Sequence, residues 1–167
     1  MWRGFMAGWA VAMTQPNAER RALGHLERQG YEVYLPRFKE SAIVEGRRVA
    51  RHGVLFSRYL FVSVADRWHS ILGTIGVTSL IRNGERPAYV PDEFIAGLRA
   101  RAGVDGVIDL SKPEHQRKIG DEDSVVAGPF YGFKGIYAGQ SSTERVYVLL
   151  NLLGRQSKVE LDQAQVA

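Results

Sequence analysis

Apolar residues follow two different periods along the first hundred residues of the chain. From Asn17 to Gln29 they recur every three to four positions, which predicts a helix with one face in a core, and shorter helical patterns follow at 67–72 and 91–101. Between these helices lie short runs rich in β-branched and aromatic residues, which predict β-strands at residues 9–13, 31–38, 54–56, 59–64 and 77–81. Strands and helices in this order predict an α+β domain.

Two stretches of this domain allow more than one interpretation. The mostly apolar residues from Phe5 to Met13 resemble a weak signal peptide, but the stretch is short and interrupted by Gly8, which favours a first strand. Residues 40–52 place Gly46-Arg47-Arg48 between apolar positions, which predicts either an exposed basic hairpin or a flexible loop. No stretch of the chain approaches the roughly 18–20 apolar residues that a membrane span requires.

The character of the sequence changes after residue 102. Residues 103–119 contain few large apolar residues and predict a linker. Beyond them, three glycines between Gly128 and Gly135 lie beside a proline, which is typical of a tight turn, and the later runs broken at Gly139 and Gly154 predict short antiparallel strands. So small a segment with so many turns suits a miniature barrel, because closure removes the exposed sheet edges.

Charge is distributed unevenly along the 167 residues, whose net charge is +4. Residues 1–60 contain ten arginines and lysines against five glutamates, whereas residues 120–167 contain four basic against six acidic residues. A basic front half is typical of a protein that faces nucleic acid, although any single arginine can instead be a solvated surface residue. The chain has no cysteine, which excludes disulfides and favours a cytoplasmic protein.

The sequence offers little support for enzyme chemistry. The four histidines have no metal-ligand spacing, and no cysteine is present to hold a metal. The turn Gly132-Phe133-Lys134-Gly135 lacks the adjacent Gly-Lys-Ser/Thr of a phosphate-binding loop, and no Ser/His/Asp arrangement stands out. We therefore expect no catalytic residue, no metal site and no cofactor.

Several motifs carry a resemblance to a known family. Gly-Pro-Phe-Tyr-Gly-Phe-Lys-Gly at 128–135, followed by Val-Tyr-Val-Leu-Leu-Asn-Leu-Leu-Gly-Arg at 146–155, resembles the C-terminal KOW domain of the NusG family of transcription elongation factors. The front half resembles the NusG N-terminal domain through motifs in that domain's order and spacing, at Trp9, His25–Gly30, Tyr34–Pro36, Tyr59–Val62, Gly76-Val77 and Val90–Glu93. The resemblance implies a NusG N-terminal domain over residues 8–102, the linker over 103–119, and an SH3-like KOW barrel over 120–167.

The resemblance also implies a surface that binds RNA polymerase. In the family, a hydrophobic patch that includes the strand at residues 59–62 docks on the clamp helices of the largest polymerase subunit. Tyr59 and Phe61 are two positions apart on a strand and therefore share a face, where aromatic anchors suit a binding hot spot. The implied contacts are Met13, Phe56, Tyr59 and Phe61, and the alternative for each aromatic residue is a place in the core. The family usually has Pro-Gly before this strand, where this chain has Ser57-Arg58.

A row of cations on the first helix suggests a DNA contact. Arg21, His25 and Arg28 recur at i, i+4 and i+7, so they lie on one helix face and can track phosphates, or else form an ordinary solvated face. In the specialised RfaH-like branch of the family, DNA-contacting residues lie on this helix face, and Thr74 falls in a further DNA-facing loop. Ile75 stands where that branch has arginine. Non-template DNA is thus a candidate ligand.

The KOW domain implies partner binding at the other end of the chain. Family C-terminal domains bind the ribosomal protein uS10 or the Rho terminator, and the candidate contacts here are Phe130, Phe133 and Leu149, while Leu150 and Leu152 fit a barrel core. The resemblance thus implies an elongation factor, general or RfaH-like, that bridges the polymerase clamp across the DNA channel and suppresses pausing or termination, and we expect it to be monomeric and cytoplasmic. The alternative is a KOW-type RNA-binding or ribosome-associated protein, which would lack the front-half motifs.

Overall fold

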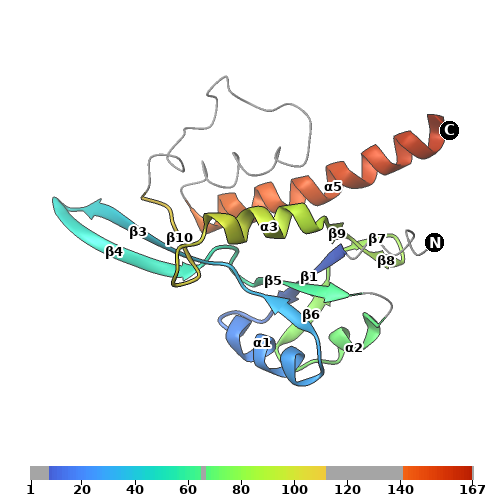
Figure 1. Cartoon of the computed structure of the whole chain (residues 1–167), viewed down its shortest axis with the longest axis horizontal. Coiled ribbons are helices and arrows are strands. Elements are labelled where there is room, and N and C mark those ends of the chain that lie inside the picture. The colour runs from blue at the N-terminus through green and yellow to red at the C-terminus, as the bar shows by residue number, and fades with distance from the viewer. Residues whose placement is uncertain (1–7, 65–66, 112–140, 167) are drawn as a thin grey trace. The chain divides into compact units, whose positions relative to one another are not determined.

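The computed structural model describes residues 8–64, 67–111 and 141–166 (Figure 1). These residues divide into two compact units. The first unit contains the chain up to Leu35, the segment Arg58–Asp92, and the chain from Leu149 onward. The second contains Pro36–Ser57 and Glu93–Val148. Each unit is described separately below.

The first unit is built on a five-stranded antiparallel sheet, as the α+β prediction requires. Strand β1 lies inside the sheet, between β5 and β6, with β2 on the outer side of β5 and β9 also paired to β1. A two-residue ladder joins β7 to β8. The strands are β1 (Gly8–Thr14), β2 (Glu32–Tyr34), β5 (Tyr59–Val64), β6 (Val77–Leu80), β7 (Arg82–Asn83), β8 (Arg86–Pro87) and β9 (Tyr89–Val90).

Two helices cover one face of this sheet through a continuous apolar core. The predicted long helix is α1 (Glu19–Arg28), and the shorter one is α2 (His69–Leu72). Alternate residues of β1 and β5 point to this side and pack with Leu26 of α1 and Ile71 of α2. The core members are Ala10, Ala12, Ala22, Leu26, Leu60, Val62, Val64, Ile71 and Leu80.

Gly76 permits a close approach between the loop before β6 and helix α1. Its φ angle is +94°, and a side chain at this position would begin only 3.2 Å from the backbone nitrogen of Ala22. The left-handed backbone and the lack of space both favour glycine here. The carbonyl of Gly76 also accepts a hydrogen bond from the Gln15 N–H at 2.9 Å, so the loop is fixed beside the start of the helix.

The second unit contains a long hairpin, which confirms the hairpin interpretation of residues 40–52. Strands β3 (Arg37–Val44) and β4 (Arg47–Val54) pair antiparallel over their full length. The turn residues Glu45 and Gly46 have φ angles of +52° and +78°, as in the type I′ turn that suits a two-residue hairpin. The predicted strand at 31–38 is thereby divided into β2 and β3 around Pro36, which has no N–H to donate to a ladder.

The predicted linker begins with regular structure. Strand β10 (Val107–Asp109) pairs parallel to the first three residues of β3 and follows helix α3 (Asp92–Arg101), which was predicted from residue 91. Residues 103–111 therefore belong to the fold of the second unit and are not a free connection. Residues 112–119 lie outside the described residues.

The C-terminal segment differs from the prediction. Helix α5 (Ser142–Val166) occupies residues 146–153, for which we predicted strands of a barrel, so that prediction is wrong for this structure. A capping box begins the helix: the Glu144 N–H donates to Ser141 Oγ, and the Ser141 N–H donates to Glu144 Oε2, both at 3.1 Å. The rest of the predicted barrel, with Phe130 and Phe133, lies outside the described residues. None of the described helices is both long and apolar enough to cross a membrane.

Candidate binding surfaces

The face of the first sheet opposite the helices carries aromatic residues from β2 and β5 beside a methionine from β1. Phe61 of β5 lies directly across from Val11 of β1 and from Tyr34 of β2, and Met13 lies across from Tyr59. The rings of Tyr34 and Phe61 are stacked with centroids 6.4 Å apart. We call Met13, Tyr34, Tyr59 and Phe61 the aromatic face. It brings together three of the four residues implied to bind polymerase.

Burial separates these residues into two kinds. Phe61 is fully buried and Tyr59 is 8% exposed, whereas Met13 is half-buried. Phe56, the fourth implied contact, is also fully buried and belongs to the second unit. A fully buried ring supports a surface but does not touch a partner, so direct contact through Phe61 would require its side of the sheet to be uncovered.

A polar clip fixes the start of strand β5. Arg58 adopts a left-handed backbone with φ of +71°, and its N–H donates to Oε1 of the buried Glu19 at 2.9 Å. Its Nε donates to the carbonyl oxygen of Thr14 at 3.0 Å, and the Thr14 N–H donates to the Arg58 carbonyl oxygen at 2.7 Å. The clip ties α1, β1 and β5 together. The sequence analysis did not identify the role of Glu19. Its place in the first turn of α1 was visible in the sequence, and an acidic side chain there interacts favourably with the helix dipole.

The structure places the predicted DNA row on the outer side of α1. Arg21 and Arg28 are exposed, and His25 between them is half-buried. Arg28 also lies in the last turn, where a cation interacts favourably with the helix dipole. The row is therefore available to a ligand along one helix face.

Thr74 is placed differently from the row. It is 5% exposed, and its hydroxyl accepts a hydrogen bond from Gln29 Nε2 at 2.8 Å and donates one to the Ser70 carbonyl at 3.0 Å. These bonds hold the 74–76 loop against the end of α1, beside the cation row. The residue that the loop presents to solvent is Ile75, which is 52% exposed.

An aromatic and cationic cluster lies at the start of α2. The rings of Trp68 and His69 are stacked 3.7 Å apart, and the Arg82 guanidinium lies 5.4 Å from the Trp68 ring centroid. Such a cation–π contact adds local stabilisation. Sequence reasoning could not find Arg82, because β7 meets α2 only in the folded chain.

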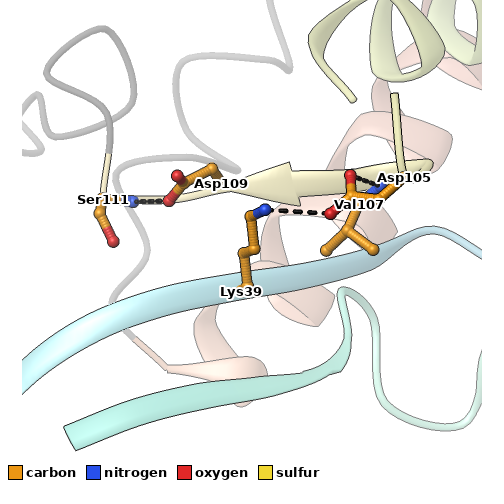
Figure 2. Close-up of polar contacts among 5 residues, drawn as sticks. All are labelled: Lys39, Asp105, Val107, Asp109 and Ser111. Carbon is orange, nitrogen blue, oxygen red and sulfur yellow. Dashed lines mark hydrogen bonds and ion pairs between the residues drawn. The ribbon is translucent and has the colours of Figure 1, made fainter. Parts of the chain in front are cut away.

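Polar contacts in the second unit hold β10 and its preceding loop to the base of the hairpin (Figure 2). Lys39 Nζ lies 3.0 Å from Asp105 Oδ2, and Asp105 Oδ1 accepts the Val107 N–H at 3.1 Å. The hydrogen bond to Lys39 lowers the pKa of Asp105, and the same bond raises the pKa of Lys39. At the other end of β10, the Ser111 N–H donates to Asp109 Oδ1 at 3.0 Å.

A buried cation fastens the start of α5 to the same unit. Arg145 is 2% exposed, its Nε donates to the Leu55 carbonyl oxygen at 2.8 Å, and its guanidinium lies 4.6 Å from the centroid of the Phe38 ring. Burial is the main cause of the lowered pKa of Arg145. Leu149, a predicted partner contact, is fully buried one turn further along the helix.

Comparison with known proteins identifies the family. The family model described as "Transcription termination factor nusG" matches residues 7–99, which is more than half of the chain. The chain belongs to the NusG family. It is therefore related to a family of transcription factors, and the matched residues contain the aromatic face, the cation row and the β3–β4 hairpin.

Curated NusG proteins from distant bacteria resemble the chain along most of its length. The transcription termination/antitermination protein NusG of Deinococcus radiodurans is 29% identical over 163 residues, covering 88% of this chain and 86% of its own. The proteins of the same name from Thermus thermophilus and Bacillus subtilis are 27% and 26% identical, each covering 95% of this chain and 96% of its own. The similarity thus extends past the region matched by the family model.

Arg58 marks a local departure from the NusG pattern. The left-handed backbone at this position is one that glycine adopts without strain, which accounts physically for the glycine usual in the family. Here an arginine accepts that conformation and gains the hydrogen bond from its Nε to Thr14. The side-chain bond offsets part of the strain.

Proposed function

We propose that this protein is a transcription elongation factor that binds RNA polymerase through the aromatic face and suppresses pausing or termination. The observation that carries the proposal is the gathering of Met13, Tyr59 and Phe61 on one sheet face within the region matched by the NusG model. That match to the front half also argues against a ribosomal KOW protein. Phe61 supports the face from within, and Tyr59 and Met13 make the contact once the face is accessible.

Replacing Tyr59 with alanine is expected to weaken polymerase binding by about 2 kcal/mol, or roughly thirty-fold, as for a central aromatic anchor. Binding of the full-length protein to purified core polymerase measures this. Leu80→Ala is the matched control, because Leu80 is buried in the core on the opposite face of the sheet. If both variants lose the same polymerase affinity, the effect is due to reduced stability. If Tyr59→Ala keeps the wild-type affinity, Tyr59 is a core residue and does not contact polymerase.

We propose that the cation row on α1 contacts the non-template DNA strand of the elongation complex. The exposure of Arg21 and Arg28 on one helix face supports this proposal. Thr74 has a supporting role, because its hydroxyl is used within the protein.

The double variant Arg21→Gln/Arg28→Gln is expected to bind single-stranded DNA more weakly. Each lost phosphate contact makes the negative slope of log affinity against log salt shallower by about 0.7 for single strands. A salt titration with a labelled oligonucleotide measures the slope. The double variant Arg67→Gln/Arg86→Gln removes the same charge from exposed positions outside the row. If the wild type and both double variants have the same slope, the row does not bind DNA and is an ordinary solvated helix face.

We propose that the C-terminal residues recruit a second partner, uS10 or Rho, through a KOW barrel formed by residues 120–167 in another state of the protein. The motifs at 128–135 and 146–155 support the barrel. The helix observed over residues 142–166 supports placement in the RfaH-like branch, whose C-terminal module changes fold. The polymerase-binding experiment, repeated with uS10 and with Rho in place of polymerase, tests the recruitment.

A further inference from the structure

The hairpin of the second unit extends well beyond the strand that supports it. Strand β10 pairs only with Arg37–Lys39, so among the described residues β3 and β4 continue without a third strand from Glu40 to the turn. At about 3.3 Å per residue, this free part is roughly 15 Å long. Figure 1 shows it as a narrow two-stranded arm. We call residues 40–51 the ribbon.

The ribbon is basic and exposed. Arg47, Arg48 and Arg51 are all exposed on β4, and none forms an ion pair within the described residues. Glu40 lies directly across from Arg51, and Glu45 lies in the turn. Arg47 and Arg48 instead lie across from apolar residues, so cross-strand pairing of opposite charges does not account for these two arginines. The cluster therefore indicates a function outside the fold.

The tip of the ribbon presents an arginine and an apolar side chain on each of its two faces. Arg47 and Arg48 are consecutive on a strand and point to opposite faces. Val44 lies across from Arg47 and is 38% exposed, while Ile43 lies across from Arg48 and is 75% exposed. Both faces of the tip therefore present an apolar and a cationic side chain to solvent.

We propose that the ribbon lies in the major groove of duplex DNA. That groove is about 12 Å wide and admits a two-stranded β-ribbon. Because Arg47 and Arg48 point to opposite faces, one reaches the phosphates on each wall of the groove. Val44 and Ile43 lie on the same two faces as Arg47 and Arg48, so they pack against the deoxyribose rings of the groove walls beside those phosphates.

The base of the ribbon is fixed for such binding. The Lys39–Asp105 ion pair and the hydrogen bond from the Ser41 N–H to Ser111 Oγ, at 2.7 Å, join β3 to the segment that contains β10. A fixed base lowers the entropy lost when the arm binds. The inference does not depend on polymerase docking, because duplex DNA binding is measured without polymerase.

The test compares full-length variants in their affinity for a short labelled DNA duplex across a salt titration. Arg47→Gln/Arg48→Gln is expected to make the negative slope of log affinity against log salt shallower by about two, since each B-DNA phosphate contact contributes about −0.9. The control Arg67→Gln/Arg86→Gln removes two exposed arginines outside the ribbon and is expected to keep the wild-type slope. Equal slopes in the two variants would overturn the proposal. Thermal melting confirms that each protein is folded.

Three further measurements separate the ligand classes. Methyl green, which occupies the major groove, is expected to displace the protein, and a minor-groove ligand such as netropsin is not. An RNA duplex of the same sequence is expected to bind more weakly, because its deep, narrow major groove excludes the ribbon. The ribbon variant is expected to retain polymerase affinity. Displacement by netropsin alone, tighter RNA binding, or loss of polymerase affinity with unchanged DNA binding would each overturn the proposal.

Discussion

Replacing Phe61 with alanine is expected to lower the free energy of unfolding by about 3–5 kcal/mol, the usual cost of deleting a buried phenylalanine ring. Phe61 is fully buried, stacks on Tyr34, and lies across from Val11. The deletion leaves a cavity between three strands that regular backbone pairing holds in place, so the site cannot collapse easily. Urea denaturation followed by circular dichroism measures the change.

The matched control is Ile75→Ala, which truncates a side chain that is 52% exposed. Its expected cost is below about 0.5 kcal/mol, as for an ordinary surface substitution. A loss of less than about 1 kcal/mol in Phe61→Ala would mean that the aromatic face is not packed as the structure has it. The comparison also bears on docking, because a change in polymerase affinity from Phe61→Ala is interpretable only after its loss of stability is known.

Replacing Arg145 with alanine is expected to cost about 2–3 kcal/mol and to reduce the helical circular dichroism signal. The change removes a charge-assisted hydrogen bond to the Leu55 carbonyl and leaves that buried acceptor without its donor. It also removes the guanidinium from the Phe38 ring. Because Arg145 lies in the first turn of α5, we expect the start of the helix to fray with the loss of this anchor.

Two variants at the same position separate the contributions. Arg145→Lys keeps the charge but loses the planar guanidinium that stacks on Phe38, so we expect it to recover only part of the stability. Arg145→Met keeps the volume without the hydrogen bond, and we expect it to lie between alanine and the wild type. If all three variants keep the wild-type helical signal and stability, the contacts of Arg145 do not anchor the helix.

Local patterns determined most of the first unit. The spacing of Ala18, Ala22 and Leu26 was sufficient to predict α1 and its buried side, because a helix of this period has one continuous apolar face. The alternation in residues 59–64 likewise placed Tyr59 and Phe61 on one face of a strand. The family motifs, read from the same residues, agreed with the later match to the NusG model.

Local patterns did not predict the secondary structure of the C-terminal segment correctly, because that segment fits both a helix and a strand. Residues 146–153 combine β-branched and aromatic residues, which favour a strand, with leucines at Leu149 and Leu153, which fit one helix face. The capping box at Ser141 and Glu144 and the burial of Arg145 favour the helix in this structure. The capping residues were visible in the sequence, whereas the Arg145 contacts depend on residues about ninety positions away.

The sequence by itself predicted the three helices of the front half, the strands β1, β5 and β6, the family, and which residues share one side of α1 and of β5. It placed a strand at 54–56, where β4 already ends at Val54, and it missed the short strands β7, β8 and β9. Tertiary structure decided which of those residues are accessible. Phe61 is enclosed, the Thr74 hydroxyl is bonded to Gln29 and Ser70, and the arginines of the ribbon are exposed. Burial and hydrogen bonding depend on residues that are distant in the chain, and the spacing of apolar residues within one helix or strand does not reveal which residues those are.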